Sequence, residues 1–155
     1  GAAVMLDGKL RRGFHERCGE IWPNVLNSMG ELGPENTLEN QISLWRVFEK
    51  NGMEYREGAK GMSPRIRTQI VEDIAKELAV AIHNANTLMD CKELVVCGQV
   101  IELLEEPFLE AVNRYLEEMM PLGKHPRVQV ESPFCGIAGI AGQCIEYQVE
   151  KTLEG

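Results

Sequence analysis

Residues 92–99 have the sequence KELVVCGQ, in which Leu94–Cys97 is an apolar run without polar alternation. Such a run predicts a strand covered on both faces, as in a parallel sheet. A long helical pattern precedes this strand. A second helical pattern follows it and leads to another short extended segment, RVQVES at 127–132. Alternation of strands and helices at this spacing predicts a parallel α/β layer.

The helix before this strand is predicted over Pro64–Met89. Ser63 is expected to cap its N-terminus, and Pro64 suits the first helical position because no N–H is needed there. The helix after the strand is expected to start at Pro107 and to end at Pro121. A third helix is predicted after the glycine turn of SPFCG at 132–136. The first of these helices has one broad apolar stripe, expected to be core: Ile66, Ile70, Ile74, Leu78, Ala81, Ile82, Ala85 and Met89.

Upstream, the runs Ala2–Leu6 and Lys9–Arg12 flank the pair Asp7-Gly8. An Asp-Gly pair allows the positive φ angles of a primed turn, so an antiparallel hairpin is predicted. Residues 17–36 contain Pro and Gly without periodicity and should form an irregular loop. A helix is expected from an N-cap at Thr37 to a stop at Asn51-Gly52. Its apolar positions recur at helical spacing: Leu38, Ile42, Trp45 and Phe48.

Composition restricts the class of protein. The chain has 155 residues, 44% of them apolar, and a formal charge of −8 from 16 basic and 24 acidic residues. That charge argues against this chain gripping a nucleic-acid backbone itself. No apolar run approaches the roughly 20 residues of a membrane span and no leader is evident, so a cytoplasmic protein is expected. The five cysteines form no CxxC pair or zinc-type cluster, and most are expected to be small buried hydrophobes.

Five motifs in order resemble the C-terminal lobe of the ROK family, named for its repressors, open reading frames and kinases. They are GAAVMLDGKLRRG at 1–13, CGEIWP at 18–23, NTLEN at 36–40, LVVCGQ at 94–99 and SPFCGIAGIAGQC at 132–144. The resemblance covers nearly the whole chain. It implies an α/β fold, with a mixed sheet and flanking helices, that forms one lobe of an actin-like ATPase (ribonuclease H-like) fold. Residues 1–155 would then be a single domain and a fragment of a longer protein.

The resemblance also implies a sugar site. In this family two loop glutamates contact sugar hydroxyls, and they match Glu20 and Glu39 here. The family also binds a structural zinc through one His and three Cys. The zinc His falls on Pro23 and the last zinc Cys on Thr37, and the other cysteines have no counterpart in 24–36, so no zinc and no other cofactor is predicted. Trp22 could offer a flat face to a sugar ring, or fill the volume of the lost metal loop.

The features that the resemblance implies for a nucleotide site are weaker than those for the sugar site. The family's phosphate-gripping turn would lie before residue 1. Gly98 matches the first Gly of the adenosine-side pair, but Gln99 replaces the second. Gly136 and the helix after it could cradle an anion, or form a tight strand-to-helix turn. A ROK kinase takes its general base from the other lobe, so this segment alone is not expected to be catalytic.

These observations favour the effector-binding and dimerising portion of a ROK-type transcriptional regulator of carbohydrate metabolism. Its expected partners are a sugar or sugar-phosphate effector and a second copy of itself, with no membrane. DNA would be bound only through an upstream domain. The alternative is the C-terminal lobe of an ATP-dependent sugar kinase, and a ligand-free oligomerisation domain remains a third possibility.

Overall fold

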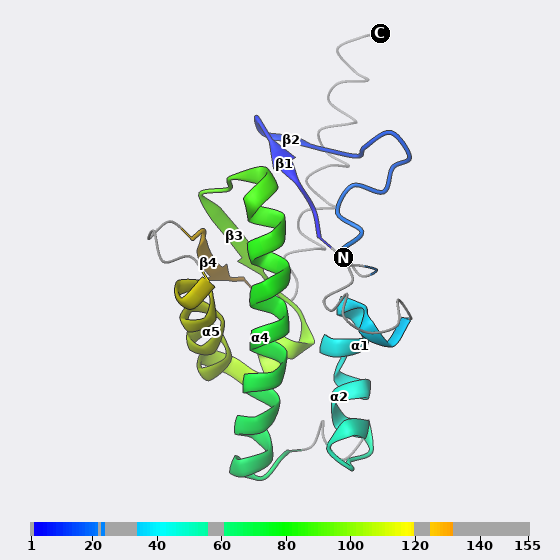
Figure 1. The fold of residues 1–155 in the computed structure, drawn as a ribbon, viewed down its shortest axis with the longest axis vertical. Helices are drawn as coiled ribbons and strands as arrows, with labels where there is room; N and C mark the ends of the chain where they lie inside the picture. The colour runs from blue at the N-terminus through cyan, green and yellow to red at the C-terminus, as the bar shows by residue number, and fades with distance from the viewer. Residues whose placement is uncertain (1, 22, 24–33, 56–60, 120–124, 132–155) are drawn as a thin grey trace, which may run out of the picture.

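The structure is a computed structural model and describes residues 2–21, 23, 34–55, 61–119 and 125–131. It confirms a mixed α/β protein with an antiparallel hairpin, a parallel strand pair and flanking helices (Figure 1). Within the described residues the hairpin and the parallel pair are separate two-stranded sheets. The elements in chain order are β1 (Met5–Leu6), β2 (Lys9–Leu10), the 3₁₀ helix η1 (Pro34–Asn36), α1 (Leu38–Ile42), α2 (Leu44–Lys50), α4 (Pro64–Met89), β3 (Glu93–Val96), α5 (Gln99–Met119) and β4 (Arg127–Val130).

The hairpin forms as predicted. Met5 pairs with Leu10 in the antiparallel ladder, and the turn residues Asp7 and Gly8 have φ angles of 52° and 74°. Positive φ at both turn positions matches the right-handed twist of the flanking strands.

Gly19 joins the following loop to the start of the chain. Its carbonyl accepts a hydrogen bond of 2.7 Å from the Ala2 N–H. Its φ is 96°, and a Cβ there would collide with the carbonyl oxygen of Ala2. Both the backbone conformation and the close approach therefore require glycine.

The predicted helix from Thr37 to Asn51 is two helices. Ser43 has a ψ of 130°, which ends α1 and begins α2. The N-cap position of Thr37 and the stop at Asn51-Gly52 are confirmed, since Gly52 has a φ of 68°. The apolar spacing continues across the break, so the sequence pattern did not reveal it.

Helix α4 has the predicted boundaries. The Ser63 hydroxyl accepts a hydrogen bond of 3.4 Å from the Ile66 N–H, and Pro64 occupies the first turn. The helix ends at Asp90, which adopts the left-handed conformation that commonly closes helices. Figure 1 shows α4 at the centre of the molecule, with α5 on one side and α1 and α2 on the other.

Helix α5 corrects the prediction that the second helix starts at Pro107. It starts at Gln99, directly after β3, and is broken at Glu105, whose φ is 56° and ψ −152°. Pro107 therefore begins only the second helical portion. The first portion, Gln99–Leu104, was missed because six residues before a proline are too few to show a convincing helical period.

Strands β3 and β4 are parallel, as predicted, with Glu93 opposite Arg127 and Val96 opposite Val130. The prediction that β3 is covered on both faces is wrong for the described structure, because Val95 is 53% exposed and Val130 43%. Side chains alternate across a strand, so the inward residues of β3 are Leu94 and Val96. The helix predicted after 136 lies outside the described residues.

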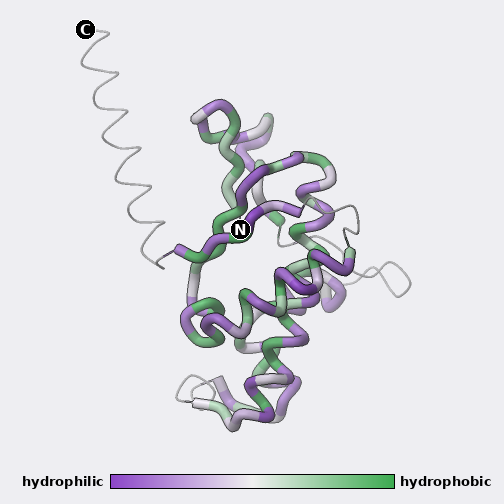
Figure 2. Tube along the Cα trace, turned by 90° about the vertical axis from the view of Figure 1, so that its left-hand side faces the viewer, coloured by the Kyte–Doolittle hydropathy of each residue, from purple (hydrophilic) through white to green (hydrophobic). Residues whose placement is uncertain are grey.

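The core lies where α2, α4, α5 and β4 meet. Phe48, Ile70, Leu104 and Leu116 are all fully buried there. Along the helices of Figure 2, hydrophobic and hydrophilic segments alternate as expected of amphipathic helices. The buried members of this cluster are Val47, Phe48, Ile70, Val71, Ile74, Ala75, Ala79, Ile82, Ile101, Leu104, Phe108, Ala111, Val112, Leu116 and Val128.

The cysteines differ from expectation. Cys18 and Cys97 are exposed and Cys91 is only partly buried. Cys18 lies in a turn, Cys97 directly follows β3, and Cys91 lies between α4 and β3. Cys135 and Cys144 lie outside the described residues. Among the helices that the structure describes, none is long and apolar enough to cross a membrane.

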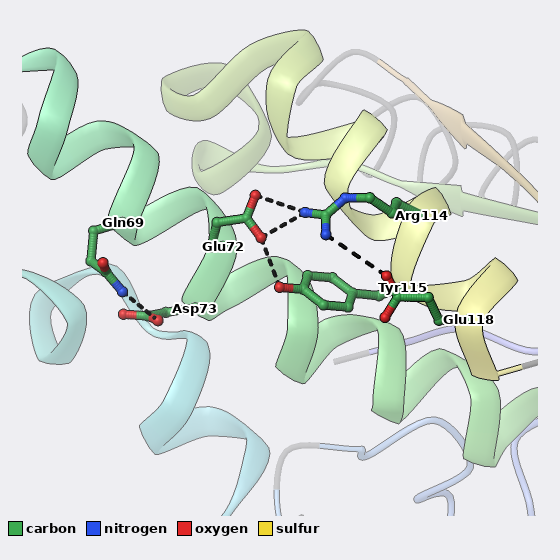
Figure 3. A network of polar contacts seen from close by, with 6 residues as sticks. All are labelled: Gln69, Glu72, Asp73, Arg114, Tyr115 and Glu118. Carbon is green, nitrogen blue, oxygen red and sulfur yellow. Dashed lines mark hydrogen bonds and ion pairs between the residues drawn. The ribbon is translucent and has the colours of Figure 1, made fainter.

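A polar network ties α4 to the second portion of α5 (Figure 3). Arg114 donates to both carboxylate oxygens of Glu72, at 2.7 and 2.6 Å, and the Tyr115 hydroxyl donates to the same carboxylate at 2.7 Å. The hydrogen bonds from Tyr115 and Arg114 lower the pKa of Glu72. The bond to Glu72 also raises the pKa of Tyr115.

Candidate functional site

An open hollow of about 710 Å³ lies where α1, α2 and the start of α5 come together. It is open to solvent rather than enclosed. The lining mixes aromatic, aliphatic and polar groups, and its one charged residue among those described is a glutamate. The lining residues are Glu39, Leu44, Trp45, Tyr55, Gln99 and Val100.

Glu39 is one of the two glutamates predicted to contact sugar. It stands in the first turn of α1, where a carboxylate is favoured by the helix dipole. Its backbone carbonyl accepts a hydrogen bond of 2.9 Å from Ser43, at the break between α1 and α2. This break turns the chain so that Glu39 of α1 and Trp45 of α2 line one hollow.

Trp45 and Tyr55 give the hollow two partly exposed aromatic side chains, with exposed fractions of 49% and 45%. The Arg46 guanidinium lies 4.1 Å from the centre of the Trp45 ring, and Arg46 also pairs with Glu49 at 3.2 Å. The Tyr55 ring lies 5.9 Å from the buried ring of Phe48. Both aromatic side chains are therefore held by neighbours while part of each stays accessible.

Gly98 and Gln99 form the turn from β3 into α5. Gly98 has a φ of 116°, a conformation that glycine alone adopts readily, although a Cβ there would meet no atom within 4 Å. Its carbonyl accepts hydrogen bonds from Ile101 and Glu102 that begin the helix. This turn places Gln99 in the hollow, where its Oε1 accepts a hydrogen bond of 3.4 Å from the Tyr55 hydroxyl.

The remaining predicted site residues are not brought to the hollow. Glu20 is exposed in the loop after the hairpin and does not line it. Gly136 and Trp22 lie outside the described residues. The expectation of a nucleotide near Gly98, and of sugar at Glu20, remain predictions.

Metal ligands do not gather in the described part of the chain, where no group of three or more His, Cys, Asp or Glu side chains could hold an ion. Pro23, which stands where the family has a zinc-binding His, has no ligating atom. The absence of zinc remains a prediction from the sequence, which rests on Pro23, on Thr37 in place of the last zinc Cys and on the lack of cysteines in 24–36.

The polar groups that line the hollow could form hydrogen bonds with the hydroxyl groups of a ligand. A carboxylate and a side-chain amide can together accept and donate several hydrogen bonds to vicinal hydroxyls. Aromatic faces suit the apolar C–H face of a sugar ring. The charged lining residue is acidic, so a neutral ligand is favoured over an anionic one.

The sequence motifs proposed Glu39, which lines the hollow, and noted Gln99, but they gave no sign of Tyr55 and placed Trp45 only on an apolar stripe. Tyr55 lies in a Gly-rich connection that gave no helical or strand pattern.

Comparisons with known proteins support the fold. No protein-family model matches the sequence, and no curated protein matches it significantly. The structure is similar to that of a ROK family protein from Streptococcus pneumoniae TIGR4 crystallised in complex with sucrose. That match has a TM-score of 0.75 and 19% sequence identity, and it covers 96% of this chain and 55% of the other.

It is also similar to a ROK hexokinase from Thermus thermophilus, with a TM-score of 0.69 and 18% identity over 83% of this chain and 47% of the hexokinase. The chain thus spans about half the length of the solved structures that it resembles. The structure therefore has the fold of one part of a ROK family protein, as the sequence motifs predict.

Proposed function

We propose that this chain is the sugar-effector-binding and dimerisation portion of a ROK-type transcriptional regulator of carbohydrate metabolism. The observation that carries the proposal is the hollow in which Glu39 lies with Trp45, Tyr55 and Gln99. One structural relative was crystallised with sucrose, which supports a carbohydrate as the ligand class. The acidic lining favours a neutral sugar over a sugar phosphate.

In this proposal residues 1–155 are one lobe of a longer cytoplasmic protein, and a DNA-binding domain precedes them. A sugar bound between this lobe and the other would favour one lobe arrangement by its higher affinity for that arrangement. A second copy of the chain would complete the regulator. Glu20 would contribute to the sugar site once the other lobe is in place.

An ATP-dependent sugar kinase is the alternative function. Gln99 disfavours it, because a long side chain stands where the kinase-like pattern has a second glycine and a nucleotide would approach the backbone. The structural similarity to a ROK hexokinase supports this alternative. Incubating the full-length protein with ATP and the same sugars, and measuring ADP release, separates a kinase from a regulator.

Calorimetric titration of the full-length protein with sucrose, glucose, N-acetylglucosamine and glucose 6-phosphate tests the sugar site. Glu39→Gln should weaken binding of the preferred neutral sugar by about tenfold or more, because a charge-assisted hydrogen bond is lost. Glu110→Gln, an exposed glutamate of α5 that does not line the hollow, is the matched control and should bind as the parent does.

Two results would count against the proposal. If no sugar binds to the parent protein, the ligand class is wrong. If Glu39→Gln binds as tightly as Glu110→Gln, the sugar lies elsewhere, and Glu20→Gln then shows whether the loop after the hairpin holds it.

A further inference from the structure

Helix α5 contains a break that leaves backbone carbonyls in need of partners. In a continuous helix the N–H of residue 107 would donate to the carbonyl of Leu103, but Pro107 has no N–H. Glu105 next to it has a φ of 56° and ψ of −152°, a backbone conformation costly for any residue with a side chain. Such a break persists only where the surrounding structure holds it.

Arg67 of α4 supplies the missing donor. Its Nη2 lies 3.3 Å from the carbonyl oxygens of both Leu103 and Leu104. The same nitrogen lies 2.6 Å from the carboxylate of Glu105. A cation at the end of a helical segment also suits the negative pole of its dipole.

The backbone of Arg67 is held in place by the first turn of α4. Its N–H donates to the carbonyl of Ser63 at 2.9 Å, in the first, capped turn of the 26-residue helix α4. Its side chain is 37% exposed, and its Nε is buried without a partner among the described residues. The three hydrogen bonds from Arg67 to α5 therefore all involve Nη2, whose side chain starts from a capped helical turn.

The six residues Gln99–Leu104, called here the arm, run from the hollow to this contact. At one end Gln99 and Val100 line the hollow. Glu102 and Leu103 line a smaller hollow beside it, of about 280 Å³. At the other end Leu104 is fully buried, and its carbonyl meets Arg67.

We propose that Arg67 is a positioning residue that holds the arm and so places Gln99 in the hollow. The arm is short, with a glycine turn at one end and a proline break at the other, so helical hydrogen bonding alone does little to fix it. Arg67 adds hydrogen bonds to the carbonyls at its C-terminal end, beside the buried side chain of Leu104. The part of the inference that concerns ligand binding rests on the proposed function, whereas the part that concerns the arm does not.

Hydrogen exchange measured by mass spectrometry on the full chain tests the arm. Arg67→Met keeps most of the apolar stem but removes the donors. Exchange of the amides of Ile101–Leu104 should become about fivefold faster or more. Arg67→Lys, which retains a charge and donors, should restore part of the protection.

Arg114→Met is the matched control. Arg114 also joins α4 to α5 by an ion pair, with Glu72 at 2.6 Å, but in the second portion of α5. It should leave exchange in the arm unchanged. Equal exchange of the arm in Arg67→Met and Arg114→Met would overturn the inference, since a general loosening of the helix pair would then explain both.

Sucrose titration of the same variants separates this inference from the proposed function. Weaker sucrose binding in Arg67→Met than in Arg114→Met supports both the role of Arg67 in holding the arm and the proposed sugar site. Faster exchange of the arm with no sucrose binding even by the parent leaves Arg67 as the holder of the arm and counts against sucrose as the ligand. Faster exchange with unchanged sucrose affinity would show that Gln99 does not need the arm in order to act.

Discussion

At the scale of single residues, two glycines are required for different reasons. One is needed for its backbone conformation alone, and the other also because the backbone of another residue lies close to it. Gly8 and Gly19 both have positive φ angles, of 74° and 96°. A Cβ at Gly8 would meet nothing within 4 Å, whereas a Cβ at Gly19 would collide with the Ala2 carbonyl. The first position therefore needs only a permissive backbone, and the second also needs empty space.

Gly19→Ala should accordingly destabilise the N-terminal region more than Gly8→Ala. We expect about 1 kcal/mol for the conformational cost at either site, and about 1–3 kcal/mol more at Gly19 for the collision. Hydrogen exchange of the amides in 2–12 measures the local loss, and urea unfolding measures any global one. Equal effects of the two substitutions would contradict the close approach.

Glu72 allows a test by pH. Its pKa is lowered by the hydrogen bonds from Tyr115 and Arg114, so its contribution is present above the unfolded pKa of about 4.3 and is lost as pH falls through the lower folded value. Tyr115→Phe should raise the pKa of Glu72, and the stability difference between parent and variant should shrink below about pH 4. Carboxyl NMR titration measures the pKa. Glu118→Gln, which removes a 3.9 Å contact with Arg114, should leave it nearly unchanged.

At the scale of elements, two serines both occupy the N-cap position of a helix, but only one of them has a hydrogen-bonded hydroxyl among the described residues. Both are N-cap residues, Ser63 of α4 and Ser43 of α2. The Ser63 hydroxyl accepts a backbone hydrogen bond. The Ser43 hydroxyl is buried and has no partner within the described residues.

Ser63→Ala should therefore cost about 0.5–1 kcal/mol of stability, because a helix donor loses its acceptor. Ser43→Ala should be neutral or slightly stabilising, because a buried unsatisfied hydroxyl is removed. Guanidinium unfolding of both variants measures the difference. A loss at Ser43 as large as at Ser63 would show that its hydroxyl is bonded in solution.

The helices and the hairpin also show which parts of the fold could be predicted from the sequence alone. Local signals predicted α4 over Pro64–Met89 with Ser63 as its N-cap, and the Asp7-Gly8 turn, because capping and turn chemistry act over a few residues. The break at Ser43 was not predictable, since the apolar spacing continues through it. The start of α5 was missed because Pro107 gave the stronger local signal.

The same limit applies to the site. Glu39 was predicted from a motif, and Gln99 was noted as a departure from one. Tyr55 was not found, because its place in the hollow depends on how a connection without periodicity packs against Phe48. Tertiary contacts of this kind leave no trace in local spacing.

At the scale of the whole molecule, one contiguous core joins the helices that carry the hollow. Val47 and Phe48 of α2 belong to the same buried cluster as Ile74 of α4 and Leu104 of α5. A small domain with one core usually unfolds as a unit. The hollow should then persist for as long as the core does.

Urea unfolding of residues 1–155 with Trp22→Phe tests this unity, because Trp45 is then the single tryptophan of these 155 residues. Its fluorescence and the far-UV circular dichroism should give the same midpoint. Phe48→Ala should lower both midpoints together, with a loss of about 3–5 kcal/mol. A fluorescence change at lower urea than the dichroism change would mean that α2 leaves the core first.

The broken helix α5 has a consequence for anyone who would improve this protein. Pro107 reads as a flaw that alanine would repair, since alanine favours helices and restores the absent N–H. Straightening the helix would change the angle between Gln99–Leu104 and the second portion of α5. Under the proposed function this change would displace Gln99 in the hollow, so Pro107→Ala would add stability at the expense of ligand binding.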